Sequence, residues 1–150
     1  MMSDDYAKYQ EQCEKIRQEN AQLLNEFTDW LAAKGTSETT VRRHRQNMDL
    51  YLNHFLLYED AIKAAEGSAM AGLFLGSWFI RKAMWASQSS LKSSAASLKK
   101  FYTFMVATSR VTQENLDCLT MRIKEDMHEW LEILARYNDP NITDSAAIWG

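Results

Sequence analysis

The sequence predicts an all-α protein, a bundle of four to five helices with long helices at both ends. Apolar residues recur at steps of three and four along most of the chain, as they do on the buried face of an amphipathic helix. No segment alternates apolar and polar residues with the period of two that is typical of strands. Only one proline and five glycines interrupt the 150 residues, which favours long helices.

The first helix is expected from about Asp4 to Lys34, with Gly35 as its C-terminal stop. Its apolar positions form a heptad seam that contains one polar residue, Asn20, and such a residue can fix pairing register. The seam consists of Tyr6, Tyr9, Cys13, Ile16, Asn20, Leu23, Phe27 and Trp30. It is expected either to pack on this protein's own core or to pair with a second copy.

Ser37 or Thr36 is expected to cap a second helix that runs from about Glu38 to Leu57. The spacing puts one set of side chains on the buried stripe and another set on the outer face. The buried stripe is Val41, His44, Met48, Tyr51, Leu52 and Phe55, and the outer face is Arg42, Arg43, Gln46 and Asn53.

A short helical turn is expected over Ala61–Glu66, and Ser68 is expected to cap an apolar helix over Ala69–Trp85. The sequence Ser87-Gln88-Ser89-Ser90 then starts a fourth main helix that ends near Thr108. Its inner face is apolar, and its outer face holds Lys92, Ser93, Ala96, Lys99 and Lys100.

Thr112 is expected to cap a last helix that runs to about Tyr137. This helix carries a second heptad seam, consisting of Leu116, Leu119, Ile123, Met127, Trp130, Leu134 and Tyr137. Residues 1–138 therefore read as one helical domain. Residues 139–150 are expected to form a tail that is loose unless it is docked, for example by Ile148 and Trp149.

Charge is distributed unevenly along the chain, although the net charge is only −3. Residues 1–34 hold seven acids and four bases, residues 35–110 five acids and ten bases, and residues 111–150 eight acids and three bases. The middle of the chain is therefore basic between acidic ends. A local basic surface of this kind indicates a phosphate-bearing partner.

The sequence offers little that would support catalysis or metal binding. His44, His54 and His128 lack metal-ligand spacing, and no glycine-rich phosphate loop is present. No nucleophile stands beside a plausible base. Cys13 and Cys118 both fall on predicted apolar faces and are expected to be buried free thiols, with a disulfide as the alternative. We therefore expect no catalytic residue, cofactor, metal or small-molecule substrate.

The apolar stretch over residues 70–85 contains Gly72, Gly76, Arg81 and Lys82, so it is too short and too charged to span a bilayer. The first residues, Met1-Met2-Ser3-Asp4-Asp5, do not have the pattern of a signal peptide. A cytoplasmic protein without membrane contact is therefore expected.

Residues from about 22 to 116 resemble the N-terminal core-binding domain of tyrosine recombinases and phage integrases, a SAM-like helical module. The first match is Leu24-Asn25-Glu26-Phe27-Thr28-Asp29-Trp30-Leu31, followed by Lys34-Gly35. In the pattern Thr-x-x-x-Tyr-x-x-Asp-Leu of the family's next helix, the positions are filled by Thr40, His44, Asn47 and Met48. Ser90-Leu91-Lys92 and the run from Leu98 to Met105 resemble the family's fourth helix.

The resemblance implies that the second and fourth helices lie against duplex DNA as half of a clamp. On matching positions the contacts would be Arg42, Arg43, Gln46, Lys92, Ser93, Lys99 and Lys100. The family's catalytic half has no room in this chain. Leu116 follows Asn115 where recombinases often have Asn-Pro, so a long acidic helix is expected in place of the linker to that half.

The leading hypothesis is a non-catalytic DNA-binding protein derived from a recombinase core-binding domain. The alternative is a protein-interaction or oligomerisation module that keeps the fold and has lost DNA binding. A third hypothesis is a fragment of a full integrase, against which the capped last helix and the Pro140 tail argue. The seams of the first and last helices are expected to pack within one chain or to form a homodimer.

Overall fold

The computed structural model describes residues 2–138, and this part of the chain is helical without strands, which confirms the all-α prediction. The predicted tail, residues 139–150, lies outside the described residues. The elements are α1 (Met2–Ala33), α2 (Glu38–Asp49), η1 (Leu50–Phe55), η2 (Ala64–Met70), α3 (Ala71–Leu73), η3 (Phe74–Trp78), α4 (Phe79–Lys82), α5 (Gln88–Ala107) and α6 (Gln113–Tyr137).

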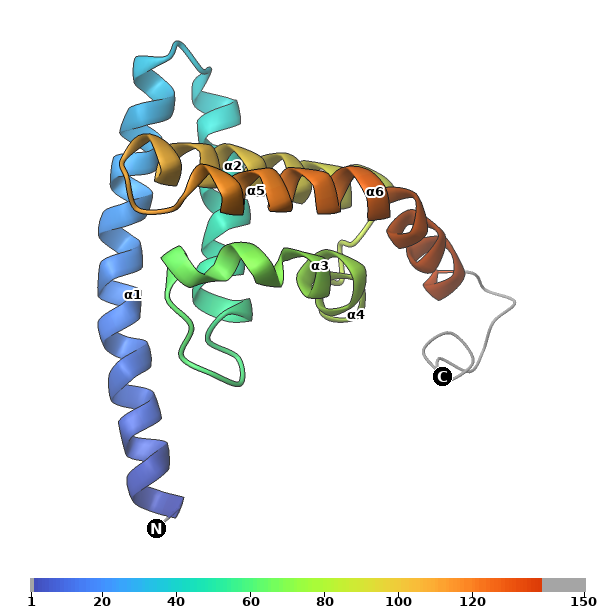
Figure 1. Ribbon diagram of the computed structural model, residues 1–150. Coiled ribbons are helices and arrows are strands. Elements are labelled where there is room, and N and C mark those ends of the chain that lie inside the picture. Colours follow the sequence, from blue (N-terminus) through green and yellow to red (C-terminus); the bar gives the residue numbers. More distant parts are fainter. Residues whose placement is uncertain (1, 139–150) are drawn as a thin grey trace.

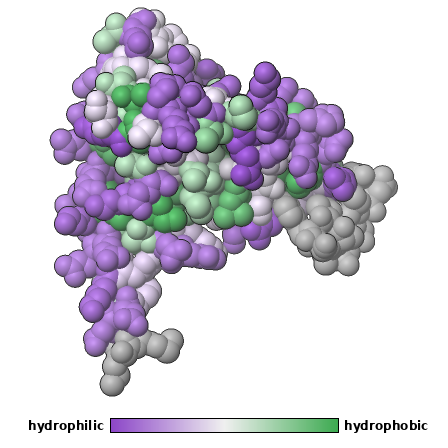
Figure 2. Space-filling model, viewed as in Figure 1, coloured by the Kyte–Doolittle hydropathy of each residue, from purple (hydrophilic) through white to green (hydrophobic). Residues whose placement is uncertain are grey.

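Figure 1 shows α1 and α2 as a hairpin of two helices, with α5 and α6 running side by side across it. The hairpin turns at Gly35, whose positive φ of 85° is a conformation that glycine adopts without strain. The N-terminal part of α1 projects beyond the rest of the molecule. Hydrophilic side chains gather along α1, and apolar ones appear in the middle of the face shown in Figure 2.

Side-chain caps fix where three of the helices begin, as the sequence predicts. The Ser37 hydroxyl accepts from the Thr40 backbone N–H at 3.3 Å, which makes Ser37 the cap of α2. Ser87 and Ser90 cap α5 reciprocally, each hydroxyl accepting from the other's backbone N–H. Thr112 caps α6 through the N–H of Asn115 at 3.2 Å. These bonds satisfy N–H groups that lack partners inside the helix.

The predicted bounds of the third helix, Ala69–Trp85, are wrong. The helical run starts at Ala64 and ends at Lys82, so Ser68 is a buried residue inside it and not its cap. The Tyr102 hydroxyl donates to the Ala64 carbonyl at 2.8 Å, and the Tyr51 hydroxyl donates to the Gly67 carbonyl. These two buried tyrosines hold the first turn from outside it, which local sequence signals cannot reveal.

Both heptad seams pack on the chain's own core. In α1, Phe27 meets Phe101 edge to face with ring centroids 5.2 Å apart, and Cys13 and Ile16 pack with Leu57. In α6, five of the seven seam residues are buried: Leu116, Leu119, Ile123, Trp130 and Leu134. Only Tyr6, which is 61% exposed, leaves a large apolar seam position in solvent. The seams are thus covered within one chain.

The two cysteines have different environments. Both are free thiols, and Cys13 is buried as predicted. Cys118 is exposed, so the prediction of burial is wrong for this residue. The reason is geometric: α6 buries the stripe that contains Leu119, and Cys118 lies one residue off that stripe.

Two glycines of the 64–82 run allow side chains of α6 to lie directly against its backbone. A Cβ atom at Gly76 would come within 2.6 Å of the indole Nε1 of the buried Trp130. A Cβ atom at Gly72 would come within 2.5 Å of the Arg122 guanidinium, which is the end of an exposed, flexible side chain. The two positions therefore differ in how easily their neighbour can move.

We predict that Gly76→Ala lowers the free energy of unfolding by about 1–3 kcal/mol, because the Trp130 ring is enclosed and must shift. Gly72→Ala is the matched control. There the guanidinium can swing away, and the better helix propensity of alanine offsets the loss of its contacts. Urea denaturation of both variants checks this. Equal destabilisation by the two substitutions would contradict the assignment of the Trp130 contact.

Candidate functional site

The helices α2 and α5 are joined by a network of buried polar side chains. His44 Nδ1 lies 2.7 Å from the Ser97 hydroxyl oxygen. The Asn47 side-chain amide donates to the same oxygen at 2.9 Å and to the Ser93 hydroxyl at 3.1 Å. His44 is 6% exposed and Ser97 is fully buried. Because buried polar groups need partners, this network fixes the position of one helix against the other.

The His44 imidazole also reports on the charges around it. Burial lowers the pKa of His44, and the nearby cations Arg43 and Lys100 lower it further. One of these cations comes from α2 and the other from α5. The neutral ring can then accept from the Ser97 hydroxyl, whose oxygen in turn accepts from Asn47. One cation of each helix therefore lies near this buried imidazole.

The structure places the predicted DNA contacts on the outer sides of these neighbouring helices. All but one of the seven are exposed, namely Arg42, Arg43, Gln46, Lys92, Lys99 and Lys100. Ser93 is half-buried, and its hydroxyl accepts from Asn47 in the contact between the helices. We call the five cations of this set, Arg42, Arg43, Lys92, Lys99 and Lys100, the basic face.

Sequence reasoning did not find every residue that shapes this surface. It did not single out Ser97, which both His44 and Asn47 contact. It also placed Asn53 on the outer face, whereas Asn53 is half-buried and its Oδ1 accepts from Asn20 of α1. The only available signal was the unusual polarity of Ser93, Ser94 and Ser97 on a helix that otherwise has an apolar inner side.

The cations of the basic face are not neutralised within the described part of the chain. The ion pairs found there are Arg110–Glu26, Arg122–Asp126 and His128–Glu132, and none includes a member of the basic face. Helix α5 has three lysines and no acidic residue. In α2 the two acids stand at the ends, and the Asp49 carboxylate accepts from the Asn53 amide. The basic face is therefore available to an anionic partner.

Residues 2–138 contain no group of three or more His, Cys, Asp or Glu side chains that could hold a metal ion. Across the same residues, no helix combines the length and the apolar character that crossing a membrane requires. The surface that stands out is the basic face, whose donors are guanidinium and ammonium groups. Such groups bind phosphate and carboxylate oxygens.

Comparisons with protein-family models, with curated proteins and with solved structures found no match to this chain. The resemblance to tyrosine recombinases therefore rests on the residue pattern alone.

We predict that the protein loses stability as the pH falls below about 6.5. The folded state holds His44 neutral through a lowered pKa, so the unfolded chain binds a proton there at a higher pH than the folded chain does. Proton uptake on unfolding makes the free energy of unfolding fall with falling pH. Urea denaturation between about pH 7.5 and pH 5 measures the effect.

His44→Gln, which keeps a hydrogen-bonding group and cannot titrate, should give a flatter dependence of stability on pH. His54→Gln removes an exposed imidazole of η1 and should retain the wild-type dependence. Identical pH profiles for wild type and His44→Gln would show that the buried imidazole is not the group responsible.

Proposed function

We propose that this protein binds duplex DNA through the outer sides of α2 and α5 and does so without catalysing a reaction on it. The observation that carries the proposal is the basic face: five exposed cations on two adjoining helices, none in an ion pair with another described residue. The chain carries a net charge of −3, so an overall excess of lysine and arginine does not explain why these unpaired cations gather on α2 and α5.

The chemistry of the basic face suits the DNA backbone. Arginine and lysine neutralise phosphates and release condensed counterions, which drives binding at low salt. Lys92 and Lys99 are seven residues apart, or about 10 Å along a helix. The major groove is about 12 Å wide, so the two ammonium groups can reach phosphates on its two sides. These contacts orient the protein without reading sequence.

Gln46 is the one uncharged, exposed member of the predicted contact set. A glutamine amide can donate to and accept from an adenine edge in the major groove. We assign Gln46 this role of base contact. Ser93 has the different role of holding α2 against α5 through Asn47.

The resemblance to the recombinase core-binding domain supports the same surface, since that domain places its second and fourth helices on DNA. Here these are α2 and α5. The position where the family often has Asn-Pro is occupied by Asn115-Leu116, in the first turn of α6. The chain thus continues as a helix that packs on α5. We therefore infer that the protein is an accessory factor that binds DNA and does not cleave it.

The alternative function is a protein-interaction module, and exposed apolar side chains favour it. Leu73, Met84 and Trp85 are 56%, 99% and 61% exposed. Scattered apolar residues are normal on protein surfaces, so this observation weighs less than the unpaired basic face.

We predict that the protein binds duplex DNA and that binding weakens steeply between about 50 and 200 mM salt. Arg42→Ala/Arg43→Ala should bind more weakly and show a salt slope that is smaller by about two phosphate contacts. Because the proposal places both helices on DNA, Lys99→Ala/Lys100→Ala should likewise bind more weakly and show a smaller salt slope. Fluorescence anisotropy of a labelled duplex measures each slope.

The matched control is Lys124→Ala/Arg136→Ala, which removes two exposed cations from α6. Equal weakening in this control would mean that net charge and not the basic face governs binding. Absence of binding by the wild type even at low salt would refute the proposal and leave the protein-interaction module as the better hypothesis.

A further inference from the structure

A tight turn between α4 and α5 holds two large apolar side chains in solvent. The Ala86 N–H donates to the Ala83 carbonyl at 3.1 Å, so Met84 and Trp85 are the two central residues of the turn. Their side chains are 99% and 61% exposed. The centres of turns usually carry glycine, proline, asparagine, aspartate or serine. Backbone geometry therefore does not explain a methionine next to a tryptophan at this place.

The turn is anchored at both ends, so its two central side chains project from a supported backbone. Ala83 is buried, and Ala86 packs against the core. The Ser90 hydroxyl donates to the Trp85 carbonyl at 3.3 Å, and Ser90 also takes part in the cap of α5. A backbone that is already held in place does not have to be ordered on binding, which lowers the entropic cost of binding.

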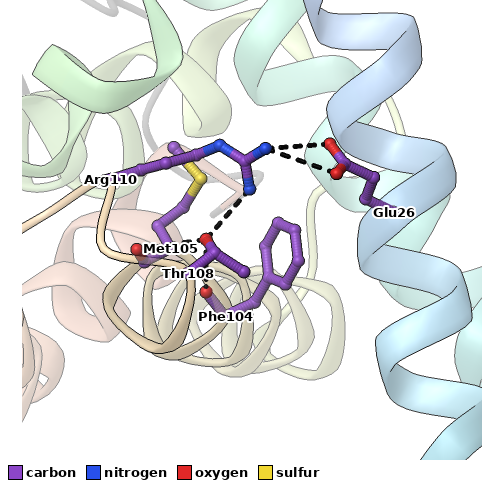
Figure 3. A network of polar contacts seen from close by, with 5 residues as sticks. All are labelled: Glu26, Phe104, Met105, Thr108 and Arg110. Carbon is purple, nitrogen blue, oxygen red and sulfur yellow. Dashed lines mark hydrogen bonds and ion pairs between the residues drawn. The ribbon is translucent and has the colours of Figure 1, made fainter.

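The charge around the turn favours an anionic partner. Residues 67–113, which include the turn, contain six lysines and arginines and no aspartate or glutamate. Figure 3 shows that Arg110 of this stretch donates to Glu26, an acid of α1. Arg81 and Lys82 are the last residues of α4 and directly precede the turn. Exposed apolar side chains would suit a protein partner as well, but this concentration of positive charge favours nucleic acid.

The turn is also continuous with the basic face. Lys92 lies four residues after Gln88, the first residue of α5, or about 6 Å along the helix. The contact between Ser90 and the Trp85 carbonyl places the turn against the same end of α5. A duplex that contacts Lys92 would therefore run close to Met84 and Trp85.

We propose that Met84 and Trp85 form a wedge that opens one base-pair step of the DNA bound at the basic face. Trp85 stacks on a base at the opened step, and Met84 fills the gap beside it. Apolar side chains act in this way in proteins that kink DNA, and every base has a face on which an aromatic ring can stack. The inference rests on the proposed DNA binding and adds to it a preference for DNA whose bases are already partly unstacked.

The test compares two short labelled duplexes that differ only in one central mismatched base pair. Fluorescence anisotropy with the full chain measures the affinity for each duplex. The wild type should bind the mismatched duplex about tenfold more tightly, because a mismatch lowers the cost of unstacking. A wedge also bends the duplex, so energy transfer between dyes at its two ends should rise when the wild type binds.

Trp85→Ala should weaken binding to the mismatched duplex about tenfold and remove both the preference and the rise in energy transfer. Its salt slope should equal that of the wild type, since the substitution removes no phosphate contact. This unchanged slope separates the wedge from the cations of the basic face. Trp85→Phe keeps an aromatic ring and should retain most of the preference. Met121→Ala removes an exposed apolar side chain of α6 and is the control, which should bind both duplexes like the wild type.

Two results would overturn the wedge and leave the proposed DNA binding in place. One is equal affinity of the wild type for the two duplexes, and the other is an unchanged preference in Trp85→Ala. Either result would mean that the exposed pair does not enter DNA. Absence of wild-type binding to both duplexes at low salt would instead refute the proposed function, and the wedge with it.

Discussion

The arrangement of the basic face depends on the Ser97 hydroxyl, which contacts both His44 and Asn47. It lies in the interface between α2 and α5 and is fully buried. If the helices slid by one residue, the four polar side chains of this network would lose partners, and each unmet buried group costs about 1–3 kcal/mol. An apolar contact of the same area would tolerate such sliding far better. The network therefore fixes the register in which the two helices present their cations on adjoining surfaces.

The rest of the fold holds this pair of helices in place mainly through aromatic rings. Phe27 of α1 packs against both Phe101 and Phe104 of α5, with centroids 5.2 and 5.6 Å away. Beyond the C-terminal end of α2, the π-helical turns η1 and η3 pack against each other. The ring centroids of Tyr51 and Phe74 are 4.9 Å apart there. Tyr51 and Tyr102 use their hydroxyls to satisfy carbonyls of η2. The same side chains thus fill the core and complete backbone hydrogen bonding, so the connecting run from Ala64 to Lys82 becomes part of the core.

The sequence was sufficient where local rules determine structure. Ser37, Ser87 and Thr112 mark helix starts because a cap acts within three residues. It was insufficient where distant residues decide. The start of η2 depends on Tyr102, which is 38 residues away from its Ala64 acceptor. Heptad spacing revealed that the seam of α1 is buried, but not that Asn20 would meet Asn53 and leave its oxygen unpaired. The outward cations were predictable because helical periodicity separates the two faces, whereas the role of Ser97 required knowledge of which helices pack.

The distribution of charge gives the strongest physical reason to expect an anionic partner at α2 and α5. Like charges that crowd a surface destabilise the folded state, and a chain with twenty acidic residues could relieve them by pairing. The chain instead pairs Arg110 with Glu26 and Arg122 with Asp126, and the basic face stays without acidic partners among the described residues. Burial, together with the nearby Arg43 and Lys100, lowers the pKa of His44, so this imidazole stays neutral and adds no further positive charge to the basic face. Bound phosphates would offset the repulsion among these cations, so the same feature that weakens the free protein would strengthen the proposed complex with DNA.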